Sequence, residues 1–257
     1  MRKKLILLVS MLLLGSSFVF SDAVSFKFVY FAPRAKSDLW DEEFRLMDFT
    51  KSSFHSTSIS FGYEYFLRRE ISFLISVDTY TRKKVGIYDG LVGETIDDYY
   101  NPEIDTDYFA FDYGEGYAIQ HTFDVSITPI QLSVKLTPMG RRQRFIPYVG
   151  AGVGIYFWTA RLLGDWIRFD QFDKFIDQST GEEVIGRPIY FADVRDENKI
   201  TFGYHAFGGV MIPVSNRLSL DLEFKYNVAQ GDLKRFEGFE PFDLNSYLFS
   251  LGISYWF

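Results

Sequence analysis

Cysteine is missing from this chain of 257 residues, and histidine occurs only three times. Without cysteine the protein forms no disulfide, binds no metal through a thiolate and carries no lipid-modified cysteine. Long apolar runs are missing as well, since the longest extends only from Leu5 to Leu14 and a transmembrane helix needs roughly 20 residues. We therefore expect no transmembrane helix, no metal site and no cofactor.

The first residues have the features of an export signal. Basic residues at positions 2–4 precede the apolar stretch, and small residues suited to cleavage follow it. We predict a signal peptide over residues 1–21, cut after Ser21 or Ala23, and a single mature domain over residues 22–257. The mature chain would carry 24 basic and 34 acidic residues, a net charge of about −10, which argues against nucleic acid as a partner.

The last segment of the chain shows a clear period of two. From Asn245 to Phe257, large apolar residues alternate with serine, glycine and a few others. Successive side chains of a strand point to opposite faces, so one face of this segment is almost wholly apolar. Transmembrane barrels use this pattern, because lipid-facing residues alternate with lumen-facing ones. The aromatic content of 19% at a mean hydropathy of −0.04 fits apolar residues dispersed among polar ones.

Seven further segments alternate in the same way, and we expect their apolar phase to face outward. They are Val24–Tyr30, Thr57–Tyr65, Ile71–Val77, Tyr117–Thr137, Val149–Phe157, Ile200–Val210 and Leu218–Tyr226. In the fourth, the apolar phase shifts at Pro129: Phe123, Val125 and Ile127 precede it, and Ile130 and Leu132 follow. We interpret this shift as a β-bulge.

The connections between these segments alternate in length. The short ones cover residues 67–70, 138–144 and 213–216, and the longer ones cover 34–53, 82–116, 161–198 and 229–243. This rhythm predicts an all-β fold: an eight-stranded antiparallel up-and-down transmembrane β-barrel with long extracellular loops and short periplasmic turns. We expect a monomer in the outer membrane of a bacterium. A soluble lipocalin-like barrel is the alternative, and it requires apolar residues inside and polar ones outside.

Two motifs resemble a known group of proteins. Thr128-Pro129-Ile130 leads into an apolar strand and a short basic turn, which the glycine-rich segment Pro147–Gly154 follows. The chain resembles the small outer-membrane barrels of the OmpW and OmpA-like group. Its end also matches the pattern that barrel-assembly machinery reads, through Ser250, Gly252, Tyr255 and Phe257. The resemblance implies outer-membrane lipid and that machinery as partners, and a small hydrophobic solute as possible cargo that escapes sideways into the membrane.

Charged residues fall on the inward phase of several segments. They are Glu64, Asp78, Asp124, Lys135, Asp221, Glu223 and Lys225. An interior of eight strands is just wide enough for side chains to fill, which disfavours a broad diffusion pore. One interpretation is an ion-paired plug that holds the barrel in shape. The other is a narrow gated conduit whose charges set selectivity.

Glycines on one inward face make room in the barrel. We consider a possible interior cavity bounded by Tyr148, Gly150, Gly152, Gly154, Tyr156 and His205. Glycine in a strand marks close approach by other groups or a sharp bend, so packing by large neighbours is the alternative.

An enzyme is the least favoured class. We place His55 and His121 on the outward phase near the extracellular ends of their strands, where histidine serves as a polar anchor. Neither has a serine two residues further on, so a barrel-embedded lipid hydrolase lacks a nameable nucleophile, base and orienting group. The second long loop is rich in acidic and aromatic residues, among them Asp97, Asp98, Asp105 and Asp107. It lacks a calcium-binding pattern, and we expect a solvated surface or a site for an extracellular partner.

We therefore predict a non-enzymatic envelope protein with a structural or surface-interaction role. A narrow channel for small hydrophobic solutes is the first alternative, and the lipid hydrolase is the second.

Overall fold

The computed structural model describes residues 22–34, 36, 50–88, 107–108, 119–140, 143–167, 171, 173–176, 181, 183–187, 189–232 and 241–257. The predicted signal peptide and the acidic residues Asp97, Asp98 and Asp105 lie outside these ranges. Among the described residues no helix has the length and apolar character needed to cross a membrane.

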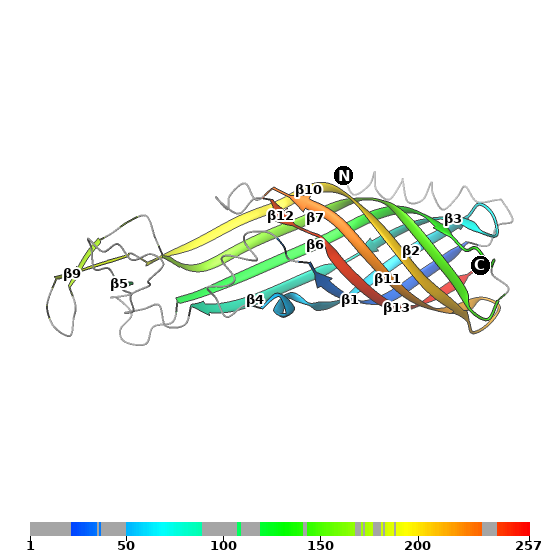
Figure 1. Cartoon of the computed structure of the whole chain (residues 1–257), viewed down its shortest axis with the longest axis horizontal. Helices are drawn as coiled ribbons and strands as arrows, with labels where there is room; N and C mark the ends of the chain where they lie inside the picture. Colours follow the sequence, from blue (N-terminus) through cyan, green and yellow to red (C-terminus); the bar gives the residue numbers. More distant parts are fainter. Residues whose placement is uncertain are drawn as a thin grey trace, which may run out of the picture.

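Eight antiparallel strand positions close into a barrel, as predicted (Figure 1). Its strands are β1 (Ala23–Pro33), β2 (Ser56–Phe66), β3 (Ile71–Asp78), β4 (Tyr80–Tyr88), β6 (Ile119–Leu136), β7 (Ile146–Ile167), β10 (Ile189–Pro213), β11 (Leu218–Gly231) and β13 (Ser246–Trp256). Strands β3 and β4 occupy one position, because both pair with β6 in the same register on either side of Thr79. Pairing of β1 with β13 closes the ring.

Short elements lie in the longer connections. A 3-10 helix, η2 (Lys51–Phe54), precedes β2, and β12 (Phe242–Asp243) pairs with the end of β11. A separate small sheet consists of β5 (Asp107–Tyr108), β8 (Asp173–Ile176) and β9 (Glu183–Arg187). Ala23 pairs with Trp256, so the chain enters and leaves the barrel at the same end as the short turns.

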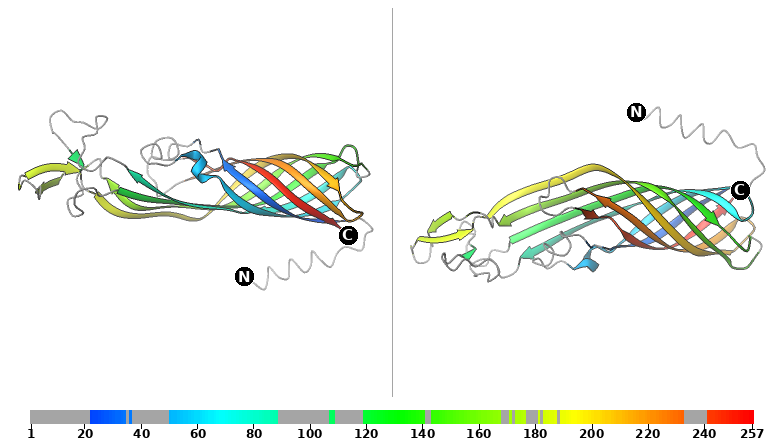
Figure 2. Two further views of the ribbon diagram at one scale, coloured as in Figure 1. Left: turned by 90° about the horizontal axis from the view of Figure 1, so that it is seen from below. Right: turned by 45° about the horizontal axis from the view of Figure 1, so that its top comes forward.

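Four strands continue beyond the barrel at the opposite end. Strands β4, β6, β7 and β10 form a projecting sheet that the other strands do not accompany (Figure 2). The predicted connections 82–116 and 161–198 are therefore wrong at their edges, since β4, β7 and β10 extend into them. Polar residues dominate the outer side of these extensions, which is why apolar alternation did not reveal them.

The predicted bulge at Pro129 is wrong. Strand β6 pairs with β7 in an unbroken register from His121 to Leu136, and odd-numbered residues point inward along its whole length. Phe123 and Val125 are therefore buried, whereas Ile130 is on the outer surface. A register shift occurs instead in β10, between Asp196 and Lys199, where the strand pairs with β7.

The apolar phase changes because the surroundings of the strand change. Beside Ile130 the outer surface is apolar and the interior is polar, as expected in lipid. Before Thr128, toward the start of β6, the inner face of the strand packs against aromatic residues. The outer face of this part carries Ser126 and Asp124. The same change occurs on β7 after Phe157, where Trp158 lies inside. The membrane boundary therefore passes near Thr128 and Phe157.

Candidate functional site

Lysines and carboxylates meet inside the barrel. Lys27 Nζ lies 2.7 Å from Glu223 Oε2 and 3.1 Å from Asp221 Oδ2. The Tyr148 hydroxyl lies 2.5 Å from Asp221 Oδ1 and 3.0 Å from Glu223 Oε2. All four side chains are buried, and a buried charge is tolerated only when it is paired and hydrogen-bonded. These contacts connect β1, β7 and β11 through the barrel interior.

Two more buried ion pairs lie near this group. Lys135 Nζ is 2.9 Å from Glu64 Oε2, and Lys225 Nζ is 2.8 Å from Asp78 Oδ2. Lys225 also donates to the Gln131 amide oxygen at 2.9 Å. The interior network thus contains three ammonium groups and four carboxylates, and each of these groups forms an ion pair with a side chain of another strand.

The network contains six of the seven charged residues that the sequence placed inside. The exception is Asp124, which lies on the outer face of β6 between the buried Phe123 and Val125. Its inward placement is wrong because it assumed a phase change at Pro129. Lys27 belongs to the network and was missed, although its inward phase between Phe26 and Phe28 was visible in the sequence.

The predicted cavity residues are closely packed. A β-carbon on Gly150 would lie 2.3 Å from the Phe207 ring, and one on Gly152 would lie 2.0 Å from the backbone oxygen of Leu132. The His205 ring stacks on Phe207 with 6.0 Å between centroids. These glycines therefore admit a neighbouring ring and a neighbouring strand, in agreement with the packing alternative.

The remaining members of that group join hydrogen bonds. Tyr156 accepts a hydrogen bond from the Gln131 amide at 3.2 Å, and Gly154 would place a β-carbon 3.1 Å from the same side chain. Gln131 also donates to Asn227 at 2.9 Å. Amide and hydroxyl groups therefore continue the charged network toward the extracellular end.

A serine and a histidine form a contact that the sequence did not reveal. The Ser133 hydroxyl lies 2.7 Å from His205 Nε2, and both side chains are buried inside the barrel. A hydrolytic triad needs an acid at the other ring nitrogen, and His205 Nδ1 has no hydrogen-bond partner among the described residues. The pair therefore lacks its orienting group.

Aromatic residues close the extracellular end of the interior. Phe31 stacks on Tyr80 with 4.0 Å between centroids. Phe54 from η2 and Phe242 from β12 pack against the Phe123 ring at 5.6 and 6.2 Å. The rings of Phe54 and Phe242 thus come from the connections between barrel strands, and both are fully buried. We call Phe31, Phe54, Tyr80, Phe123, Trp158 and Phe242 the aromatic plug.

Polar contacts hold the connection that carries Phe242. Asp243 Oδ1 accepts the backbone N–H of Asn245 at 2.9 Å, and Asp243 Oδ2 accepts that of Lys36 at 3.1 Å. Asn245 Oδ1 accepts the N–H of Ala229 at 2.8 Å. These bonds join the first and last long connections at the barrel mouth.

A second apolar cluster closes the periplasmic end. Leu74, Ile146, Phe207 and Met211 pack together with the Trp256 ring against them. Trp256 also stacks on Phe66, with 5.6 Å between centroids. The charged network thus lies between two apolar layers.

The two remaining histidines differ in their surroundings. His121 is buried on the inner face of the projecting sheet, so its predicted outward placement is wrong. Burial lowers the pKa of its ring to about 4. Its ring contacts the backbone oxygen of Asp165. His55 Nδ1 lies 2.8 Å from the Tyr30 hydroxyl on the outer surface. Among the described residues no three His, Asp or Glu side chains are placed to hold a metal ion.

The residues of the predicted assembly signal lie at the end of the barrel and along β13. Tyr255 and Phe257 are exposed on the outer surface, and the Ser250 hydroxyl donates to the backbone oxygen of Glu223 at 3.4 Å. A β-carbon on Gly252 would lie 2.6 Å from the Lys27 side chain. Gly252 therefore makes the space that Lys27 needs to enter the interior.

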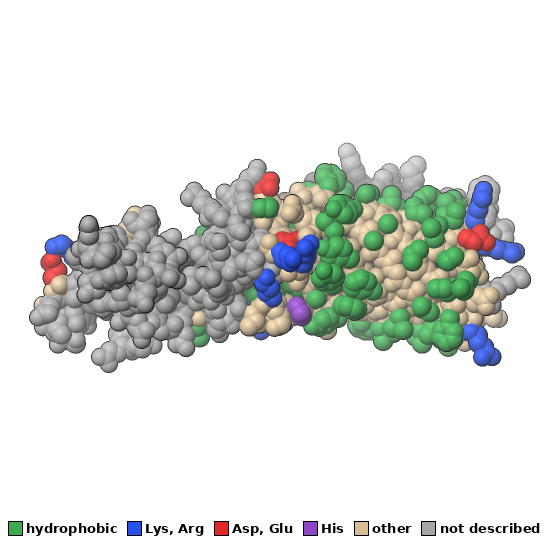
Figure 3. Space-filling model, in the orientation of Figure 1, with side chains coloured by type: hydrophobic (Ala, Val, Ile, Leu, Met, Phe, Trp, Pro, Cys, Tyr) green, Lys and Arg blue, Asp and Glu red, His purple; other side chains and the backbone are tan. Residues whose placement is uncertain are grey.

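An apolar band surrounds the barrel, with cationic side chains at both of its margins (Figure 3). The exposed residues of the band include Phe28, Phe61, Ile75, Leu132, Val153, Phe202, Leu222 and Phe249. This outward phase is confirmed on every barrel strand below the level of Thr128. It contradicts the lipocalin-like alternative, which requires a polar exterior.

Charged residues form a row on the outer face of the projecting sheet. Lys83 pairs across strands with Asp124, Asp124 with Arg161, and Arg161 with Arg195. Both arginines donate to Asp193, at distances of 2.6 to 3.1 Å. These bonds from Arg195 and Arg161 hold the pKa of Asp193 well below its usual range. Such a row belongs in water, above the apolar band.

Comparisons with known proteins give weak similarities. Neisserial surface protein A is 12% identical over 92% of this chain and 96% of its own, with a TM-score of 0.42. Ail of Yersinia pestis, in complex with the heparin analogue sucrose octasulfate, is 10% identical over 92% and 98%, with a TM-score of 0.43. The outer membrane protein AlkL in DMPC bilayers is 16% identical over 95% and 93%, with a TM-score of 0.39. No family model and no curated protein matches the sequence, and similarity this low assigns no function to the chain.

Proposed function

We propose that this protein is an integral outer-membrane barrel that carries no open conduit and presents its projecting sheet as an interaction surface outside the cell. The observation that supports this most directly is the extension of β4, β6, β7 and β10 beyond the barrel, with charged residues on its outer face. A barrel that served only to fill the membrane would not need strands of this length.

The filled interior supports the absence of a conduit. Buried ion pairs occupy its centre, and an apolar layer lies at each end. An ion that crossed would have to break these pairs, and uncompensated charge in a low-dielectric interior is costly. In planar bilayers we expect no discrete conductance steps, either for the unaltered protein or for Lys225→Met.

The interaction role is tested on whole cells. Cells that express the protein should adhere to a surface or to one another more than cells that lack it. A variant that neutralises the row on the projecting sheet through Lys83→Gln, Arg161→Gln and Arg195→Gln should lose this gain while its barrel still reaches the outer membrane. Equal adhesion by cells with the unaltered protein and with this variant would refute the interaction role.

A channel for small hydrophobic solutes is the second candidate. One observation favours it: Phe54 and Phe242 of the aromatic plug belong to connections, so a movement of these connections would expose the interior. Liposomes that contain the protein should then take up a hydrophobic tracer faster than empty liposomes. Uptake equal to that of empty liposomes would exclude this function.

A further inference from the structure

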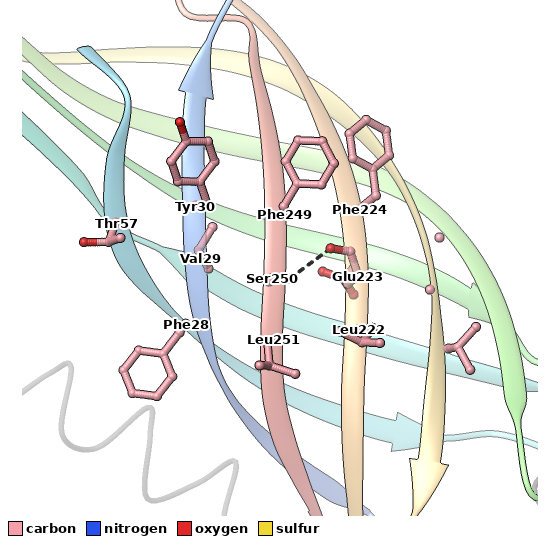
Figure 4. Close-up of a pocket in the computed structure, with 13 residues that line it drawn as sticks. Phe28, Val29, Tyr30, Thr57, Leu222, Glu223, Phe224, Phe249, Ser250 and Leu251 are labelled. Atoms are coloured by element: carbon pink, nitrogen blue, oxygen red, sulfur yellow. Dashed lines mark hydrogen bonds between the residues drawn. The ribbon is translucent and has the colours of Figure 1, made fainter. Parts of the chain in front are cut away.

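An apolar groove runs over the outer surface of the barrel within the apolar band (Figure 4). It has a volume of about 680 Å³, is open along its lipid-facing side and is lined almost wholly by apolar atoms. It crosses β10, β11, β13, β1 and β2 between two rows of outward side chains. The rows are formed by Tyr30, Phe249 and Phe224 on the extracellular side and by Phe28, Leu251 and Leu222 on the periplasmic side.

A glycine deepens the groove at one end. Gly208 on β10 stands in the extracellular row beside Phe224, whereas β1, β11 and β13 carry large aromatic side chains in that row. A β-carbon at this position would lie 3.5 Å from the nearest atom, the backbone oxygen of Tyr148, which is ordinary van der Waals contact. The backbone therefore tolerates a side chain here, and the glycine leaves space on the lipid side.

An arginine stands above the groove at its extracellular side. The Phe224 ring stacks against Tyr247, Tyr247 stacks on Tyr226, and the Tyr226 hydroxyl accepts a hydrogen bond from Arg34 Nη1 at 3.0 Å. Tyrosine is typical of the membrane interface. This chain of contacts places the guanidinium on the extracellular side of the groove, beyond Tyr247 and Tyr226, where we expect lipid headgroups.

The Tyr226 hydroxyl that Arg34 contacts is neutral, so this contact does not neutralise the charge of the guanidinium. Arg161 and Arg195 on the projecting sheet differ, because Asp193 bridges both of them. A guanidinium recognises phosphate oxygens by charge and by paired hydrogen bonds. Basic pockets at the membrane interface bind anionic headgroups in the same way.

We propose that this groove and Arg34 together form a retention site for a lipid with an anionic phosphate headgroup in the outer leaflet. An acyl chain lies in the groove between the Phe249 and Leu251 rows, and the phosphate contacts the Arg34 guanidinium. This lipid is retained on the outside of the barrel, independently of what the projecting sheet binds.

The test is native mass spectrometry of the full-length barrel, purified in detergent and offered phosphatidylglycerol or phosphatidylcholine. The unaltered protein should keep phosphatidylglycerol more tightly than phosphatidylcholine, by about fivefold, which corresponds to roughly one interfacial cation. Arg34→Gln should bring the two lipids to equal retention, and Arg34→Lys should keep part of the preference. Gly208→Leu should weaken retention of both lipids by filling the groove.

Arg161→Gln serves as the matched control, because it removes an arginine that Asp193 already engages, and it should leave the preference unchanged. Heat-modifiable migration on a gel establishes that each variant is folded. Equal retention of the two lipids by the unaltered protein would overturn the proposal. So would a preference that survives Arg34→Gln, or retention that survives Gly208→Leu.

Discussion

The Lys27 ammonium lies 2.7 Å from the Glu223 carboxylate, although 196 positions separate the two residues in the chain. They come from β1 and β11, which do not pair with each other and are separated by β13. The contact therefore passes through the interior of the barrel, over the glycine at position 252. It connects the first strand with the last hairpin.

Replacing Lys27 by methionine should destabilise the barrel strongly. The change leaves the buried Asp221 and Glu223 carboxylates without their ammonium partner, which typically costs about 3–5 kcal/mol. Urea unfolding in detergent, followed by gel mobility, gives the change in the free energy of unfolding. The double variant Lys27→Met, Glu223→Gln should recover part of the loss, whereas a single variant as stable as the unaltered protein would mean that the pairing contributes little.

Replacing Phe242 by alanine should open a cavity in the aromatic plug. The ring is 1% exposed and contacts both Phe123 and Trp158, so we expect a loss of about 3–5 kcal/mol. Phe191→Ala is the matched control, since that ring is 68% exposed on the outer face of the projecting sheet, outside the apolar band. Similar losses for the two variants would show that Phe242 is not held as a packed core residue.

Acidification should weaken the projecting sheet through His121. Burial lowers its folded-state pKa to about 4, against about 6.5 when unfolded, so the unfolded chain binds the proton more readily. The contribution of neutral His121 to the free energy of unfolding is complete above about pH 6.5. It falls by at most about 3 kcal/mol as the pH drops toward 4. Unfolding measured between pH 7 and 4 should show a shallower slope for His121→Gln, and an unchanged slope would assign the pH dependence to other groups.

Two glycines should differ sharply in their tolerance of alanine. A β-carbon on Gly152 would lie 2.0 Å from the backbone oxygen of Leu132, so the strands must separate, at a cost of about 1–3 kcal/mol or more. Gly208→Ala meets only ordinary contacts and should change stability by less than about 0.5 kcal/mol. Urea unfolding of both variants is the measurement, and equal tolerance would mean that β6 and β7 adjust freely.

The alternation of side chains predicted the strands within the membrane because it reports local geometry and local solvent. Where lipid lies outside and ion pairs lie inside, as along Leu218–Tyr226, the apolar phase gives both the strand and its orientation. Six inward charges were found on this basis. Lys27 follows the same rule, because it has the inward phase between Phe26 and Phe28 and pairs with Glu223 inside the barrel.

The shift of the apolar phase at Pro129 could not be assigned to its cause from the sequence alone. A shift of apolar residues from odd to even positions arises from a bulge in the backbone or from an exchange of surroundings, and the sequence is the same in both cases. The register of β6 against β7 decides for the second. The connections that bring Phe54 and Phe242 onto the inner face of β6 are distant in sequence, so no local pattern revealed them.

The order of residues along the chain was enough to predict the barrel class, the number of strand positions and the orientation of each strand in the apolar band. These depend on a period of two in contact with a uniform solvent. The folded structure was needed to show which charges pair, how the interior is closed and how far four strands project. Those features depend on the stagger between strands and on contacts between remote connections, and neither is encoded in the neighbours of any one residue.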